Sequence, residues 1–172
     1  MIWQEDYADG ISGDMLSRCA DSEACVSNQS GGSNQLIDTL HLSDEQWRTL
    51  AERLDHDDPY TTGQRRHQRI AYRKLAQIAV AILQPGGKWA KYIVRSRDLS
   101  PGGIGFIHGS YIYLGSECRV ILKDCNEQVT CLDGVVKRCE LLEGTAHDVG
   151  VQFNEEIDVE QFIADRPNSE SL

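Results

Sequence analysis

The stretch of sequence that decides the fold lies between residues 98 and 103 and reads Asp98-Leu99-Ser100-Pro101-Gly102-Gly103. Asp98 can accept hydrogen bonds from N–H groups such as those on a base edge, and Ser100 can donate or accept one. The two glycines allow positive φ angles and let a ligand approach the backbone closely. An ordinary Asp/Ser turn that satisfies its own backbone accounts for the same residues, so the stretch by itself leaves both interpretations open.

An arginine-rich segment precedes this stretch in the chain and reads Arg65-Arg66-His67-Gln68-Arg69. Between Thr61 and Arg97, nine residues are Lys or Arg and none is Asp or Glu. A guanidinium fork pairs bidentately with phosphate or with a guanine edge, and it can stack on a base. The segment is therefore a candidate anion-binding site, with a solvated basic surface as the alternative.

The residues between and after these two segments have the pattern of β-strands. Ile78, Val80 and Ile82 alternate with smaller or polar residues, and Pro85-Gly86-Gly87 predicts a turn before a partner strand over 89–97. Further strands are expected over 103–107, 119–123, 132–142 and 149–153, and a short helix over 159–164. Strands at this spacing, with no helix between them, favour a small antiparallel barrel.

The N-terminal third of the chain carries the excess negative charge. The net charge of the 172 residues is -10, and residues 1–60 hold 13 acidic and 3 basic residues. A helix near 43–55 is predicted because Ser43 and Gln46 form a capping box. We expect residues 1–60 to be an acidic extension that is partly disordered. Residues 61–166 would then form the barrel domain, followed by a polar tail over 167–172.

Composition and motif content exclude several classes of protein. No stretch approaches the roughly 20 apolar residues of a membrane span, and the N-terminus does not resemble a signal peptide, so we expect a cytoplasmic protein without membrane insertion. The six cysteines form no CxxC pair, which favours free thiols over disulfides, zinc binding or redox chemistry. No Ser/His/Asp or Cys/His arrangement and no GxxxxGK[ST] loop is present. We therefore expect no catalytic residue, no metal, no cofactor and no enzyme activity.

Taken together, the two segments resemble the signature of the PilZ domain family, whose members bind the bacterial second messenger cyclic di-GMP. In that signature an RxxxR motif is followed by DxSxxG, and here 28 residues separate Arg69 from Asp98. The resemblance continues through 115–122, 134–139 and 148–153, and it covers about residues 64–165.

The resemblance implies a mainly β fold, a six-stranded antiparallel β-barrel with a C-terminal helix. It also implies a cyclic di-GMP receptor that changes conformation on binding and signals to an unidentified protein partner. Arg65 and Arg69 would take the phosphates and the guanine Hoogsteen edges, and Asp98 and Ser100 would contact a base. Gly103 would keep the turn open. The implied ligand-binding residues are Arg65, Arg66, Arg69, Asp98, Ser100, Gly102 and Gly103.

Other functions remain open at this stage. The first is a PilZ-like module that acts through protein contacts without binding a nucleotide. The second is a barrel that binds single-stranded nucleic acid, a class that needs a basic groove with exposed aromatic residues. Residues 61–172 have zero net charge, and only 7% of the chain is aromatic, so this pattern argues against nucleic acid as a partner. An unrecognised enzyme is the least favoured alternative.

Overall fold

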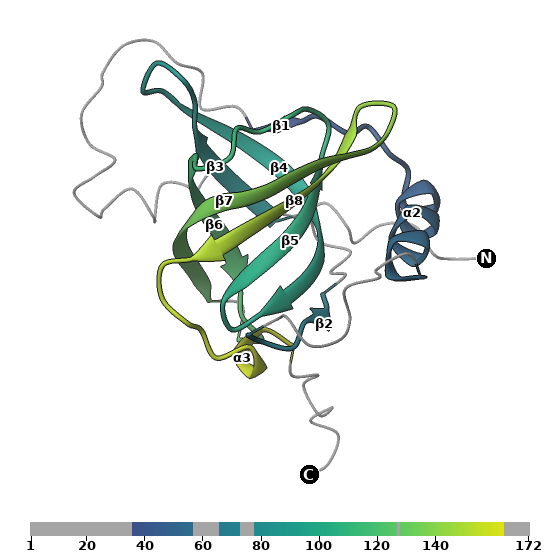
Figure 1. Ribbon diagram of the computed structural model, residues 1–172. Coiled ribbons are helices and arrows are strands. Elements are labelled where there is room, and N and C mark those ends of the chain that lie inside the picture. The colour runs from purple at the N-terminus through teal and green to yellow at the C-terminus, as the bar shows by residue number, and fades with distance from the viewer. Residues whose placement is uncertain (1–35, 57–65, 73–77, 127, 164–172) are drawn as a thin grey trace.

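The computed structural model describes residues 36–56, 66–72, 78–126 and 128–163. Its centre is a closed barrel of six antiparallel strands (Figure 1), in which the neighbours around the barrel are β3, β6, β7, β8, β5 and β4, and β4 closes against β3. The six strands are β3 (Ile78–Leu83), β4 (Trp89–Ser100), β5 (Gly103–His108), β6 (Glu117–Lys123), β7 (Val129–Glu143) and β8 (Ala146–Phe153). The fold class predicted from the sequence is thereby confirmed.

The barrel interior is filled by alternate residues of its strands, as a period of two requires. On β3 the bulky residues Ile78, Val80 and Ile82 point into the main core, whereas Ala79 packs on the outer side against Ile121. The turn that leads into β4 holds Gly86 and Gly87 at φ angles of 102° and 78°. These conformations suit glycine and explain the tight reversal that the sequence predicts.

Strand β4 is long enough to serve two sets of partners. Its first half pairs with β3 and its second half with β5. Two short strands, β1 (Ile37–Asp38) and β2 (Ile70–Ala71), add to it from outside the closed barrel. In β2, Ile70 lies opposite Leu99. Strand β4 continues to Ser100, so Asp98 and Ser100 lie within β4 rather than beyond its end.

Helix α2 (Asp44–His56) lies against the outside of the barrel, beside β5 and β8 (Figure 1). Ser43 begins it with the reciprocal bonds of a capping box. The backbone N–H of Ser43 donates to Gln46 Oε1 at 2.9 Å, and the backbone N–H of Gln46 donates to Ser43 Oγ at 3.2 Å. Trp47 is buried with Ile107 in a second core. This burial supplies most of the stability that a 13-residue helix lacks by itself.

The chain ends, as far as it is described, at one end of the barrel. Helix α3 (Glu160–Ile163) is short, and its Phe162 joins the main core together with Val159. Residue 164, the predicted end of this helix, lies outside the described residues, as do 1–35 and 167–172.

Trp89 lies on the outer face of the barrel, where the Arg119 guanidinium carbon lies 5.7 Å from the centroid of its ring.

Two further observations concern the described part of the chain. None of its helices is both long and apolar enough to cross a membrane. Its cysteines are Cys118, Cys125, Cys131 and Cys139, of which the buried Cys118 and the half-buried Cys139 are free thiols. The other two cysteines of the sequence, Cys19 and Cys25, lie outside the described residues.

Candidate ligand-binding site

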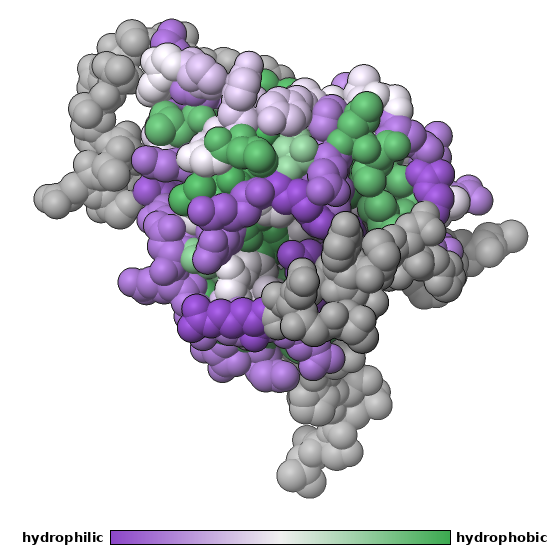
Figure 2. Space-filling model, in the orientation of Figure 1, coloured by the Kyte–Doolittle hydropathy of each residue, from purple (hydrophilic) through white to green (hydrophobic). Residues whose placement is uncertain are grey.

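A cavity of about 980 Å³ lies on the outer wall of the barrel. Strands β4, β5, β7 and β8 provide its floor, and Arg53 and Leu54 of α2 border one end. Residues 66–69 and the segment after β8 border the other end. The space-filling view shows hydrophobic side chains gathered near the β7–β8 turn (Figure 2). Leu141 of β7 is 63% exposed. The volume is within the roughly 300–1,000 Å³ usual for ligand sites.

Two β-bulges shape the floor of this cavity. In β4, Ser96 lies opposite Phe106 and Asp98 lies opposite Gly105, so Arg97 is the extra residue. In β7, Val136 lies opposite Val151 and Arg138 lies opposite Gly150, so Lys137 is the extra residue. A bulge lets two successive side chains project from the same face of a sheet. On β7 both Lys137 and Arg138 therefore line the cavity, and on β4 Arg97 lines it beside Asp98.

Two glycines lie between these bulges and leave the floor flat. Gly105 of β5 pairs directly with Gly150 of β8, which places Asp98, Gly105, Gly150 and Arg138 in one row across four strands. A Cβ atom on Gly105 would come within 2.9 Å of Asp98 Oδ1. A Cβ atom on Gly150 would come within 3.4 Å of Arg138 Cβ and 3.5 Å of its Nε. The missing side chains therefore make room for the two charged residues beside them.

The two predicted motifs meet at Arg69 and Asp98. Arg69 Nη1 lies 3.4 Å from Asp98 Oδ2, at the long end of the hydrogen-bond range. The backbone holds this approach in place, because Ala71 lies opposite Asp98 in the β2–β4 pair. The Arg69 side chain is 31% exposed. Its guanidinium is therefore loosely paired and faces the cavity.

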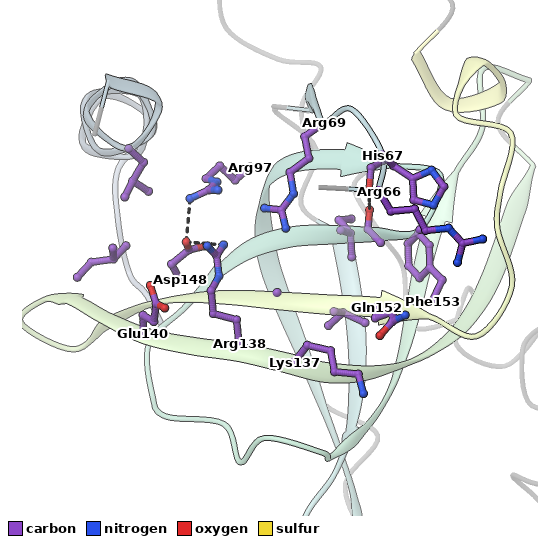
Figure 3. A pocket seen from close by; sticks show the side chains of 18 of the residues that line it. Arg66, His67, Arg69, Arg97, Lys137, Arg138, Glu140, Asp148, Gln152 and Phe153 are labelled. Atoms are coloured by element: carbon purple, nitrogen blue, oxygen red, sulfur yellow. Dashed lines mark hydrogen bonds and ion pairs between the residues drawn. The ribbon is translucent and has the colours of Figure 1, made fainter. Parts of the chain in front are cut away.

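A buried chain of charges extends from Asp98 across the floor. Arg97 donates from Nε to Asp98 Oδ2 and from Nη1 to Asp148 Oδ2, both at 2.8 Å. Arg138 Nη2 lies 2.7 Å from the same oxygen of Asp148 (Figure 3). Burial raises the pKa of Asp148 above its usual range, although the two arginines act in the opposite direction. Arg97 is only 5% exposed and thus acts as an internal counter-ion.

The glycine-rich turn has a different role from the one that the sequence suggested. Gly102 and Gly103 do not use the positive φ angles that glycine allows, because the glycines with positive φ in the described residues are at positions 86, 87, 115 and 144. Gly103 belongs to β5, and a Cβ atom there would collide with the carbonyl oxygen of Val151. Close strand packing, rather than backbone freedom, therefore explains Gly103.

Neighbouring residues hold this turn rigidly. Ser100 Oγ donates to the carbonyl oxygen of Gly103 at 3.2 Å, so the buried hydroxyl closes the turn on itself. The backbone N–H groups of Phe153 and Ile157 donate to the carbonyl oxygens of Gly102 and Pro101, at 3.0 and 2.9 Å. The carbonyl groups of Gly102 and Pro101 thus join the turn to the last residue of β8 and to the segment that follows β8.

The remaining residues of the arginine motif lie at the edge of the cavity. Arg66 is largely exposed and lies 3.3 Å from Glu156 Oε1, and His67 Nε2 lies 3.2 Å from the same atom. The imidazole also covers Gly102, and a Cβ atom added at that position would come within 2.9 Å of His67 Cδ2. Arg65, expected to bind phosphate, lies outside the described residues, as does Arg73.

Several residues of the cavity were not predicted from the sequence. The structure adds Arg97, Lys137, Arg138 and Asp148. The sequence does contain a signal for two of them, because Lys137-Arg138 is an adjacent charged pair between Val136 and Cys139. Such pairs indicate a bulge when both flanks are apolar. Nothing in the sequence places Asp148 beside them, since that contact depends on the pairing of β8 with β7.

The overall charge of the cavity favours an anion. Its described lining contains six Lys or Arg residues and four Asp or Glu residues, namely Arg53, Arg66, Arg69, Arg97, Lys137, Arg138, Glu140, Glu143, Asp148 and Glu156. The basic segment is therefore not free of acids in space, although it is free of them in sequence. No cluster of three or more His, Cys, Asp or Glu residues suited to a metal ion occurs in the described part of the chain.

Comparison with known proteins gives one family match. The family model described as the PilZ domain matches residues 63–165. This range contains both motifs and all six barrel strands, and it excludes α2. No curated protein matches the chain.

Several solved structures are similar to part of the chain. The PilZ domain of YcgR from Escherichia coli, solved with c-di-GMP, is 16% identical over 54% of this chain and 79% of its own, with a TM-score of 0.41. The complex of K. pneumonia MrkH with c-di-GMP is 16% identical over 54% of this chain, with a TM-score of 0.42. The Bacillus subtilis inhibitor of motility MotI/DgrA is 20% identical over 58%, also with a TM-score of 0.42. The chain spans 45% and 47% of the lengths of the last two proteins.

Proposed function

Because the chain belongs to the PilZ domain family, we propose that it is a receptor for cyclic di-GMP and that the cavity above the Gly105–Gly150 floor is its binding site. The observation that carries the proposal is the approach of Arg69, which lines this cavity, to Asp98 at 3.4 Å. The match over residues 63–165 includes both motifs. The proposal describes a binding protein rather than an enzyme.

The chemistry of the ligand suits these two residues. Cyclic di-GMP carries two phosphodiester charges and two guanines. The fork of Arg69 can pair with a phosphate or with O6 and N7 of guanine. A carboxylate such as that of Asp98 can accept hydrogen bonds from the N–H groups of the opposite guanine edge. Arg69 can change its loose bond to Asp98 for a stronger ligand contact without leaving a fully buried charge unpaired, since Arg97 still neutralises Asp98.

The other predicted residues have supporting roles in this proposal. Arg65 would bind phosphate, as its place in the motif implies, and Arg66 would add positive charge at the edge of the cavity. Ser100, Gly102 and Gly103 would set the shape of the turn under the ligand, because Ser100 already bonds to Gly103. His67, which covers Gly102, must move aside if a base is to reach the backbone of the turn.

Calorimetric titration with cyclic di-GMP tests the proposal. The wild type should bind, and Arg69→Ala should weaken binding roughly ten- to hundred-fold, the range for loss of one bidentate arginine contact. Arg48→Ala is a matched control, because Arg48 is exposed on α2 and does not line the cavity. Cyclic di-AMP and GTP should bind much more weakly. Absence of heat with folded wild-type protein would reject the receptor function in favour of a protein-interaction module.

We further propose that the ligand changes the position of α2 and that this change is read by a protein partner. Arg53 and Leu54 of the helix line the cavity. The ion pairs that join α2 to the barrel strands, Arg53–Glu143 and Arg95–Asp44, are exposed on at least one side. Hydrogen exchange of the α2 amides should therefore change when cyclic di-GMP is added. Exchange that ignores the ligand would contradict this part of the proposal.

A further inference from the structure

The β7 bulge places an arginine opposite Arg69, outside both motifs of the family. Arg138 stands in the row Asp98–Gly105–Gly150–Arg138, on the far side of the glycine floor from Asp98. Figure 3 shows Arg69 and Arg138 extending from different sides of the cavity toward each other. Two guanidinium groups thus face one space from two walls.

The contacts of Arg138 leave part of its hydrogen-bonding capacity for a ligand. One nitrogen, Nη2, lies 2.7 Å from Asp148 Oδ2. The buried Nε and Nη2 have no hydrogen-bond partner among the described residues, so Nη2 faces Asp148 as an ion pair only. The side chain is 27% exposed, close to the 31% of Arg69. An arginine has five N–H donors in a planar fork, so the edge that faces the cavity can still donate to an anion.

The charge balance also leaves Arg138 incompletely neutralised. Asp148 is shared with Arg97, which is itself shared with Asp98, and Asp98 is approached by Arg69. This alternating chain contains three cations and two anions, with a cation at each end. Beside it, Lys137 is exposed, lines the cavity and has no ion pair within the described residues. Lys137 therefore adds positive charge beside Arg138, whereas Glu140 and Glu143 are the acidic residues of the same strand that line the cavity.

From these contacts we infer that Arg138 binds one phosphodiester of the ligand while Arg69 binds the other, an inference that rests on the proposed function. The ligand then spans the glycine floor between two arginines. Gly150 is required because it lets Arg138 lie flat beside the floor, and Asp148 orients the fork through Nη2. Lys137 adds a second positive charge near the same phosphate.

Binding of cyclic di-GMP by three variants tests the inference against the proposed function. Arg138→Gln should bind roughly ten-fold more weakly than the wild type, and its affinity should depend less on salt, because one charge–charge contact is lost. Arg69→Ala tests whether the arginine motif contributes to binding of cyclic di-GMP. Arg119→Gln is a matched control, since Arg119 is ion-paired to Asp133 on another part of the barrel wall and does not line the cavity.

The outcomes separate the two claims. If the wild type binds and Arg69→Ala does not, but Arg138→Gln binds like the wild type, the inference is overturned and the receptor function stands. If the wild type itself fails to bind, both are overturned. If Arg138→Gln does not fold, Arg138→Lys decides instead. Lysine keeps the charge but loses the fork, so weaker binding supports the inference and wild-type binding overturns it.

Discussion

Arg97 and Asp148 form an ion pair that is almost wholly buried on the outer wall of a barrel. Nη1 of Arg97 lies 2.8 Å from Asp148 Oδ2, and the two side chains are 6% and 4% exposed. A buried pair of this kind is costly to break, because the remaining partner becomes an uncompensated charge. The pair therefore holds together the four strands that form the floor of the cavity.

Replacement of Arg97 should be strongly destabilising. Arg97→Met keeps the approximate shape but leaves Asp98 without its closest cation and Asp148 with Arg138 alone. We expect a loss of about 3–5 kcal/mol in the free energy of unfolding, measured by urea titration. Arg53→Met is the control, because its pair with Glu143 is exposed and should contribute at most about 1 kcal/mol. Equal losses in the two variants would contradict the role assigned to Arg97.

The two glycines of the turn should differ in their response to alanine. Gly103→Ala brings a Cβ atom into the backbone carbonyl of Val151, which cannot move without separating β5 from β8. Overpacking of this kind costs about 3 kcal/mol or more. Gly102→Ala meets only the ring of His67, a side chain at the edge of the cavity. Its thermal midpoint should stay near that of the wild type, and a large decrease would show that the ring cannot move.

Stability should decrease at mildly acidic pH because of His108. Burial lowers its pKa below 6.5, and nearby His147 acts in the same direction, whereas the bond to the Ser110 carbonyl opposes it. The ring also lies edge-on to Tyr92 at 4.7 Å between centroids. The unfolded state therefore takes up the proton first as the pH falls through 6.5, and stability is lost by at most about 1.4 kcal/mol per pH unit.

Urea titrations at pH 7.5 and 5.5 check this dependence. His108→Phe keeps an aromatic ring beside Tyr92 and removes the titrating group, so it should show a smaller loss between the two pH values. The exposed His41 provides a control as His41→Asn, a residue that tolerates its positive φ of 48°. An unchanged pH dependence in His108→Phe would assign the effect to other groups.

The capping box of α2 should matter locally. Ser43→Ala removes the oxygen that accepts from the backbone N–H of Gln46, which costs about 1 kcal/mol of helix stability. Hydrogen exchange should become faster in α2 and stay unchanged in β6 and β7, which do not depend on the helix for their pairing. Faster exchange throughout the barrel would show that α2 is needed for the whole domain.

The sequence was sufficient for those features that depend on local pattern. The alternation of Ile78, Val80 and Ile82 and the turn at Gly86 indicate the first hairpin, and the resemblance of the two motifs indicates that Arg69 and Asp98 share a site. The bulge at Arg97 was not predicted, because it changes which face a residue occupies without changing the apolar pattern on either side. The bulge at Lys137 was also not predicted, although the adjacent charged pair Lys137-Arg138 stands between apolar residues.

Other features depend on pairing between strands far apart in the chain. The contact of Asp148 with Arg97 joins β8 to β4 across β5, and no local pattern encodes it. Strands β1 and β2 contain two residues each, too few for any periodicity. The packing of Gly103 against the Val151 carbonyl also depends on the pairing of β5 with β8, so the sequence showed only that a glycine there allows close approach.

The pairing of Gly105 with Gly150 also has a consequence for the order of folding. Strands joined by short turns, such as β3 with β4 and β7 with β8, can pair early because little loop entropy is lost. The seam between β5 and β8 joins residues about 45 positions apart and closes late. The floor of the cavity is thus completed only with the whole barrel, so a nascent or partly folded chain should not capture the ligand prematurely.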